Sequence, residues 1–160
     1  MIRTVAAILF VWTGLLFGVS FVATPAKFLA PSLPMAQALD VGRWTFHVLA
    51  WIEWAFVIAT AGLIAVAWRS GRRGMAVAAG LIAVVAVVLA AETFVLRPLL
   101  DARVLRIMAG ESVPPGSWHN VYIALEALRL ALILAAGIHT LRQVGRVPSA
   151  PGFKLQEFAA

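Results

Sequence analysis

The sequence predicts an all-α membrane protein, a four-transmembrane-helix bundle made of two similar helical hairpins. Three observations predict it. Of the 160 residues, 62% are hydrophobic and only 12% are charged, a composition outside that of ordinary soluble domains. Four apolar segments make up most of the chain, and each has about the 20 residues that cross a hydrocarbon core. The two halves of the chain also resemble each other.

The four apolar segments are expected to form the membrane-spanning helices. They cover residues 4–23, 45–67, 75–96 and 120–141. The first and third are apolar on every side of a helix, whereas a soluble four-helix bundle needs a polar outer face. A membrane protein is therefore a better interpretation than a soluble bundle.

The first segment also has one feature of a signal peptide, because Arg3 precedes an apolar run. The run is too long for a usual signal sequence, and cleavage near Ala23 would divide the internal repeat, so we expect a retained helix. The chain contains no cysteine, which excludes disulfides and thiolate metal sites.

The halves of the chain match at an offset of 73 positions, the separation of Phe21 and Phe94. The same offset places Pro25 on Pro98 and Glu53 on Glu126. Each half therefore contains a helix, a Phe-Val-x-x-Pro exit, an outer loop and a second helix with one glutamate. Two hairpins of the same orientation would be related by an axis along the membrane normal.

The connections between the segments are expected to differ in length. The prolines at 25 and 98 are expected just past the ends of helices one and three. They begin long outer loops in which residues 26–39 and 99–109 form short interfacial helices. The inner turn at 69–74 is short, so helices two and three are antiparallel neighbours. Residues 1–147 form one transmembrane domain, and 148–160 form a disordered cytoplasmic tail.

The distribution of basic residues predicts the orientation. Seven Lys and Arg residues lie on the side of the termini and five on the opposite side. The first side includes the compact turn with Arg69, Arg72 and Arg73. Since short cytoplasmic loops are enriched in basic residues, we expect a multi-pass inner-membrane protein with both termini in the cytoplasm. The charges form no exposed basic face, so nucleic acid is not an expected partner.

Ionisable residues within the apolar segments form the candidate site. Placing an arginine near mid-bilayer costs about 2.5–3.5 kcal/mol on insertion scales, so such groups are usually paired and turned inward. On the fourth helix, spacings of three, four and three put four polar residues on one face. With the glutamates of helices two and three, the candidate polar cluster is Glu53, Glu92, His119, Tyr122, Glu126 and Arg129.

Several roles for this cluster remain open. The groups can satisfy one another in a static network that fixes helix register. They can instead form a site for a proton-coupled or anionic solute, with glutamates as proton carriers and Arg129 as counter-ion. No cofactor is predicted, although His47 and His119 are possible metal or haem ligands. The Glu-x-x-His pairs of di-iron bundles are absent from the sequence.

Short motifs carry a resemblance to a known family. They are Phe21-x-x-x-Pro25, Gly42-x-x-x-Phe46 before Glu53, and His119-x-x-Tyr122-x-x-x-Glu126 at the start of helix four. About residues 5–140 resemble a widespread family of small four-helix membrane proteins with a domain of unknown function. This family includes the eukaryotic transmembrane protein linked to cisplatin resistance. The resemblance implies a four-helix integral membrane protein and no established activity.

These observations favour a non-catalytic binding or accessory subunit. The sequence contains no nucleophilic triad or phosphate-binding loop, so an enzyme is not the favoured class. The expected partners are the lipid bilayer and either partner membrane proteins or further copies of the chain. The alternatives are a small-solute, ion or proton-coupled transporter acting as an oligomer, and a membrane metal- or haem-binding protein.

Overall fold

The computed structural model describes residues 1–70, 73–114 and 116–144. Within them it contains four helical segments long and apolar enough to cross a membrane: Ile2–Leu29, Met35–Arg69, Ala76–Met108 and Trp118–Val144. The predicted all-helical, four-span architecture is therefore confirmed, and it indicates a multi-pass membrane protein. The expected tail at 148–160 lies outside the described residues.

Two of the four spans contain more than one helical element. The first comprises α1, η1, α2 and η2, the second is α3, the third comprises α4, η4 and α5, and the fourth is α6. The bounds are α1 Ile2–Phe17, η1 Gly18–Ala23, α2 Thr24–Ala26, η2 Lys27–Leu29, α3 Met35–Arg69, η3 Arg73–Met75, α4 Ala76–Ala91, η4 Glu92–Leu96, α5 Arg97–Met108 and α6 Trp118–Val144.

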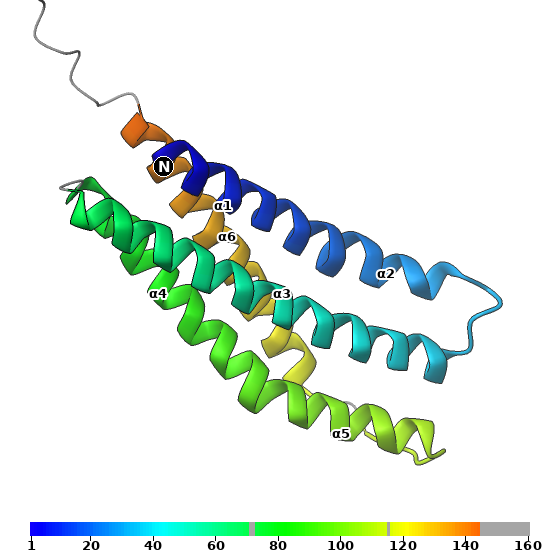
Figure 1. Cartoon of the computed structure of the whole chain (residues 1–160). Coiled ribbons are helices and arrows are strands. Elements are labelled where there is room, and N and C mark those ends of the chain that lie inside the picture. The colour runs from blue at the N-terminus through cyan, green and yellow to red at the C-terminus, as the bar shows by residue number, and fades with distance from the viewer. Residues whose placement is uncertain (71–72, 115, 145–160) are drawn as a thin grey trace, which may run out of the picture.

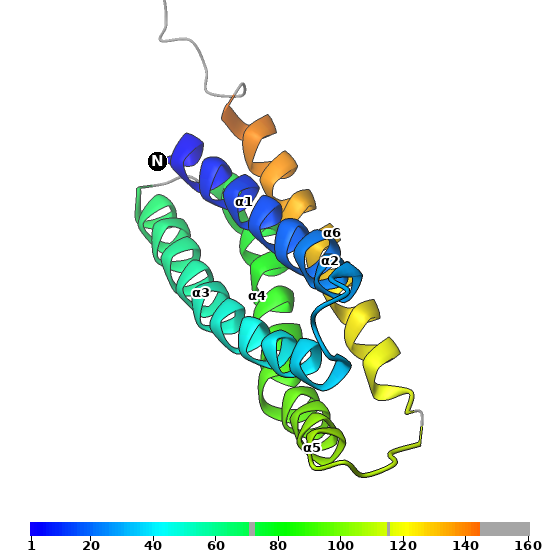
Figure 2. The same ribbon diagram turned by 90° about the vertical axis from the view of Figure 1, so that its right-hand side faces the viewer.

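The spans pack as an antiparallel bundle in chain order. Helix α1 contacts α3 and α6, and α4 contacts the same two helices. In consequence α3 and α6 face each other across the bundle (Figure 1, Figure 2). The N-terminus, the α3–α4 connection and the end of α6 lie at one end of the molecule (Figure 1). We call the opposite end, with the α2–α3 and α5–α6 connections, the outer end.

Exposed tryptophans mark a membrane-sized interval along α3. Trp44 and Trp68 are 57% and 51% exposed, and 24 residues separate them, a rise of about 36 Å. This lies between the hydrocarbon thickness of about 30 Å and the full bilayer of about 40–45 Å. The two rings are therefore spaced as interfacial anchors at opposite faces. The first turns of α3 extend beyond this interval at the outer end.

The prolines do not end the first and third helices, which corrects the sequence-based expectation. Pro25 and Pro98 lie at the starts of α2 and α5, and the chain stays helical through both. A helical proline lacks an N–H group and crowds the carbonyl four residues before it. A wider π-helical turn precedes each proline, and the Thr24 and Arg97 N–H groups bond to carbonyls five residues back, at Val19 and Glu92.

The outer connections are also shorter than expected. Residues 26–39 do not form one separate interfacial helix, because they contain the end of the first span, a connection at 30–34 and the start of α3. Residues 99–109 belong largely to α5, which continues α4 after a bend at η4 (Figure 1). The proline and the π-helical turn are the usual causes of such a bend.

A glycine ends α5 and turns the chain back toward α6. Gly110 has φ +82°, a conformation that side chains with a Cβ rarely adopt. Its N–H bonds to the Ile107 carbonyl, and the Glu111 N–H bonds to the Arg106 carbonyl, both at 3.0 Å. This is the Schellman pattern, which satisfies the last carbonyls of a helix.

Because the chain has no cysteine, single introduced cysteines can test the bundle in a membrane. Ser70→Cys lies at the α3–α4 connection, whereas Ser32→Cys and Ser112→Cys lie at the outer end. We expect a membrane-impermeant maleimide to label Ser70→Cys from one side of intact cells or sealed vesicles and the other two from the opposite side. Labelling of all three from the same side would contradict the four-span arrangement.

Candidate functional site

The centre of the bundle holds one arginine surrounded by three carboxylates. Each nitrogen of the Arg129 guanidinium contacts a different glutamate. Nη1 lies 2.7 Å from Glu53 Oε2, Nε lies 2.8 Å from Glu92 Oε2, and Nη2 lies 3.3 Å from Glu126 Oε1. The Arg129 side chain is fully buried. The guanidinium is thus the central cation of a closed ionic group.

All four spans contribute to this group. Glu53 lies on α3, Glu92 begins η4, and Glu126 and Arg129 lie on α6. The first span adds Trp12, whose indole Nε1–H donates to Glu53 Oε1 at 3.1 Å. Glu53 therefore has a donor on each carboxylate oxygen. We call these five residues the Arg129 cluster.

Helical periodicity explains how these side chains reach the centre. On α3 the buried residues Ala50, Glu53, Val57 and Thr60 follow spacings of three and four, so they share one face. Tyr122, Glu126 and Arg129 do the same on α6 and are all buried. Glu92 is the first residue of the π-helical turn, and such turns are frequent at functional sites.

The geometry of the three ion pairs is unequal. The contacts to Glu53 and Glu126 are hydrogen bonds. The Nε–Glu92 contact is close enough for an ion pair, but its atoms lack hydrogen-bond alignment, and neither Glu92 oxygen has an aligned donor. Glu53 is therefore the best satisfied carboxylate of the cluster, and Glu92 is the least satisfied.

A second polar group borders the cluster toward the outer end. The hydroxyls of Ser20 and Tyr122 lie beside the Glu126 carboxylate without hydrogen-bond alignment. Arg97 is 5% exposed and lies close enough to interact electrostatically with Glu92 and Tyr122. We call Ser20, Tyr122 and Arg97 the outer polar group. These polar side chains share the outer half of the interior with buried apolar residues such as Leu16 and Leu49.

The opposite half of the interior is apolar. Leu9, Ile64, Ile82 and Ile133 are at most 3% exposed and belong to the hydrophobic core. The buried polar side chains described in this half are the threonines at 60 and 140, whose hydroxyls have no aligned partner. The buried charged side chains thus lie in the Arg129 cluster and on its outer side, whereas the half toward the N-terminus is apolar apart from these threonines.

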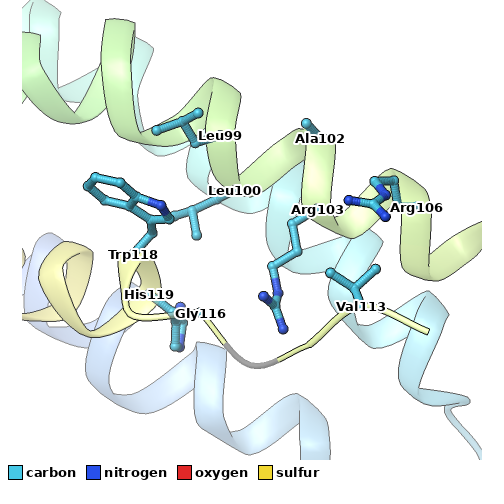
Figure 3. Close-up of a pocket in the computed structure, with 9 residues that line it drawn as sticks. All are labelled: Leu99, Leu100, Ala102, Arg103, Arg106, Val113, Gly116, Trp118 and His119. Carbon is cyan, nitrogen blue, oxygen red and sulfur yellow. The ribbon is translucent and has the colours of Figure 1, made fainter. Parts of the chain in front are cut away.

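Two histidines from the sequence analysis lie outside the cluster. His119 is in the first turn of α6 and is exposed; ten residues, or about 15 Å of helix, separate it from Arg129. It lines a cavity at the outer end (Figure 3). His47 Nε2 lies 2.7 Å from Asp101 Oδ2 and joins α3 to α5.

Within the described residues, the central glutamates and the two histidines do not come together as one group of ligands. This part of the chain contains no group of three or more His, Cys, Asp or Glu side chains arranged to hold a metal ion. The three central glutamates converge on a guanidinium instead. His47 pairs with the Asp101 carboxylate, and His119 lines the cavity.

Sequence reasoning missed two residues at this site. Trp12 lies in the middle of an apolar helix, unlike the interfacial tryptophans, and it is fully buried. An indole N–H at that depth needs an acceptor, which is the signal that would have identified it. The sequence places Arg97 among the five basic residues of the outer connections, because the helix is expected to end at Pro98. Continuation of the helix places Arg97 inside the bundle.

Comparisons with protein-family models, with curated proteins and with solved structures find no match to this chain.

Arg129→Met should strongly destabilise the bundle. It removes the cation from three buried carboxylates, and breaking a buried ion pair costs about 3–5 kcal/mol. The measurement is the free energy of unfolding in detergent micelles. Arg142→Met on the same helix is the control, because Arg142 is exposed. An Arg129→Met loss no larger than that of the control would contradict a central role for this guanidinium.

Trp12→Phe isolates the indole hydrogen bond. Phenylalanine keeps an aromatic ring near Phe56, on which Trp12 stacks with centroids 5.5 Å apart, but it cannot donate to Glu53. We expect a loss of about 1–3 kcal/mol in the free energy of unfolding, because a buried acceptor loses its partner. Trp51→Phe, at a position 76% exposed, should leave stability nearly unchanged. Equal effects of the two changes would exclude a contribution from this bond.

Proposed function

We propose that this protein is a non-catalytic accessory subunit of a membrane complex, in which the Arg129 cluster holds the four helices together. The observation that carries the proposal is the engagement of all three Arg129 nitrogens by carboxylates from three spans. Trp12 ties the first span to the same group. An arrangement that joins every helix to one buried cation favours a rigid body over a catalytic cleft.

The lipid-facing surface supports a role in assembly. Large apolar side chains stand exposed along the spans, including Val11, Trp51, Ile58, Val87 and Phe94, each at least 63% exposed. Lipid or the helices of another membrane protein can cover such faces. A rigid bundle with apolar sides is suited to pack against a partner membrane protein or a second copy of this chain.

The same proposal includes the two-hairpin repeat. The π-type bonds Thr24–Val19 and Arg97–Glu92 are related by the offset of 73 that relates Phe21 to Phe94. Glu53 and Glu126 keep that offset and both contact Arg129. Equivalent hairpins around a central arginine account for these facts, and they agree with the proposed resemblance to the four-helix family described above.

We place both termini in the cytoplasm and the protein in the inner membrane. The exposed Arg3, Arg69 and Arg142 support this orientation, because they lie at the end with the N-terminus and the last turns of α6, and basic residues are enriched on the cytoplasmic side. Arg72, Arg146 and Lys154, which belong to the same count, lie outside the described residues.

A proton-coupled or ion transporter is a second candidate function, favoured by one observation. Glu92, Tyr122 and Arg97 carry buried polar atoms without aligned partners on the outer side of Arg129. A chain of ionisable groups leading toward one face is typical of proton or ion pathways. Transport would require the apolar half of the interior to open, since the core packs tightly there.

The accessory role predicts a stoichiometric complex. Purified in mild detergent, the 17.1 kDa chain should elute with a second polypeptide, or a second copy, at a fixed ratio measured by light scattering and mass spectrometry. Deletion of a partner polypeptide should lower the abundance of this chain in the membrane, because an unpartnered apolar face favours degradation or misassembly.

The transporter candidate makes the opposite prediction. Proton or solute flux in liposomes that contain this chain without a second polypeptide, with loss of flux in Glu92→Gln, would contradict the accessory role. Under the accessory role, the wild type and Glu92→Gln show the same background flux. Trp51→Phe serves as the matched surface control.

A further inference from the structure

The outer end carries a cavity distinct from the Arg129 cluster. It has a volume of about 230 Å³ and lies between α5 and the start of α6 (Figure 3). Its lining combines apolar and basic side chains. The lining residues are Leu99, Leu100, Ala102, Arg103, Arg106, Val113, Gly116, Trp118 and His119.

The cavity is electropositive. Arg103 Nη1 donates to the neutral Pro114 carbonyl at 2.6 Å, so this bond leaves its charge uncompensated. Arg106 pairs with Glu111 at 2.6 Å, but both side chains are about half exposed, and such surface pairs are weak. Helical spacing puts the two arginines on one face of α5, and His119 supplies a further ring nitrogen.

Local structure holds the basic groups at the cavity. The Schellman turn at Gly110 returns the chain along α5. Gly116 then passes Arg103 so closely that an added Cβ would lie 3.0 Å from Nη1. The Arg103 side chain at the cavity wall is therefore held by the loop between α5 and α6, through the Pro114 carbonyl and the close approach of Gly116.

The position of the cavity places it at headgroup depth. Trp118 is 53% exposed at the outer end of α6, as expected for an interfacial anchor. Leu99, which lines the cavity, is 45% exposed and offers an apolar surface for an acyl chain. An electropositive cavity next to such a surface matches an anionic lipid better than a fully water-soluble ligand.

The volume limits the ligand. At about 230 Å³ the cavity is smaller than most small-molecule sites, which occupy about 300–1,000 Å³. It accommodates a compact charged moiety and leaves the remainder of a larger molecule outside. A phosphate group on an acyl-chain anchor has this form, and arginine binds phosphate through paired N–H donors.

We propose that this cavity binds the phosphate of an anionic phospholipid, with Arg103 and Arg106 as donors and Trp118 beside the acyl chain. The site is independent of the accessory role and of the Arg129 cluster. It would hold one lipid of the leaflet at the outer end, and it would fix the α5–α6 connection to that surface.

Lipid binding to the delipidated full-length protein in detergent tests the proposal. Native mass spectrometry would follow titrations with dioleoyl phosphatidylglycerol and dioleoyl phosphatidylcholine. We expect tighter binding of phosphatidylglycerol to the wild type. In Arg103→Gln/Arg106→Gln its affinity should fall about tenfold, because charge-assisted hydrogen bonds are lost. Arg103→Lys/Arg106→Lys should recover part of it.

The control pair Arg69→Gln/Arg142→Gln removes two exposed charges at the opposite end and should keep wild-type affinity at the outer site. Circular dichroism checks that each variant retains its helices. Unchanged phosphatidylglycerol affinity in Arg103→Gln/Arg106→Gln would overturn the proposal. Displacement of the lipid by an equal concentration of inorganic phosphate would overturn the lipid assignment and indicate a free-anion site.

Discussion

The central constraint on this protein is the charge of Arg129 inside an apolar bundle. A guanidinium cannot leave its donors unpaired at that depth, and lipid supplies no acceptors. The chain answers this requirement with hydrogen bonds to Glu53 and Glu126 and an ion pair to Glu92, and the tryptophan of the remaining span donates to Glu53. The helix faces, the rotation of each span and the depth of the cluster all have to agree with this one group.

We infer that such a cluster contributes to the specificity of packing more than to stability. Desolvation of buried charges offsets most of their attraction, so a bundle with apolar residues in their place can be equally stable. An ionic group of fixed geometry nevertheless penalises any register that separates its members. In this chain every span contributes to the cluster, so a shift of any one helix carries this free-energy cost. The packing is therefore defined from inside the bundle, although the lipid-facing side chains are largely apolar.

Two π-helical turns allow the first and third spans to continue as helices past their prolines. Each widens the helix before a proline and keeps the chain helical beyond it. In the third span the wide turn begins at Glu92, and Arg97 follows it. Both side chains are buried, so this one turn brings a carboxylate and a guanidinium into the interior. The bend at this turn also sets the direction of α5, which forms one wall of the cavity and carries Arg103.

Hydropathy and helical spacing in the sequence are enough to predict the four spans and the polar face of α6. Hydropathy over about 20 residues reports burial in lipid directly, and helical spacing brought Tyr122, Glu126 and Arg129 to one face, whatever their partners. Which acids meet the arginine follows from the packing of the bundle, since contacts between Glu53, Glu92 and Arg129 depend on how separate helices rotate and cross. The structure also shows that the chain stays helical through both prolines. A proline after an apolar run predicts a helix end by local rules, and the wider turn that prevents this forms through backbone bonds that residue identities do not specify.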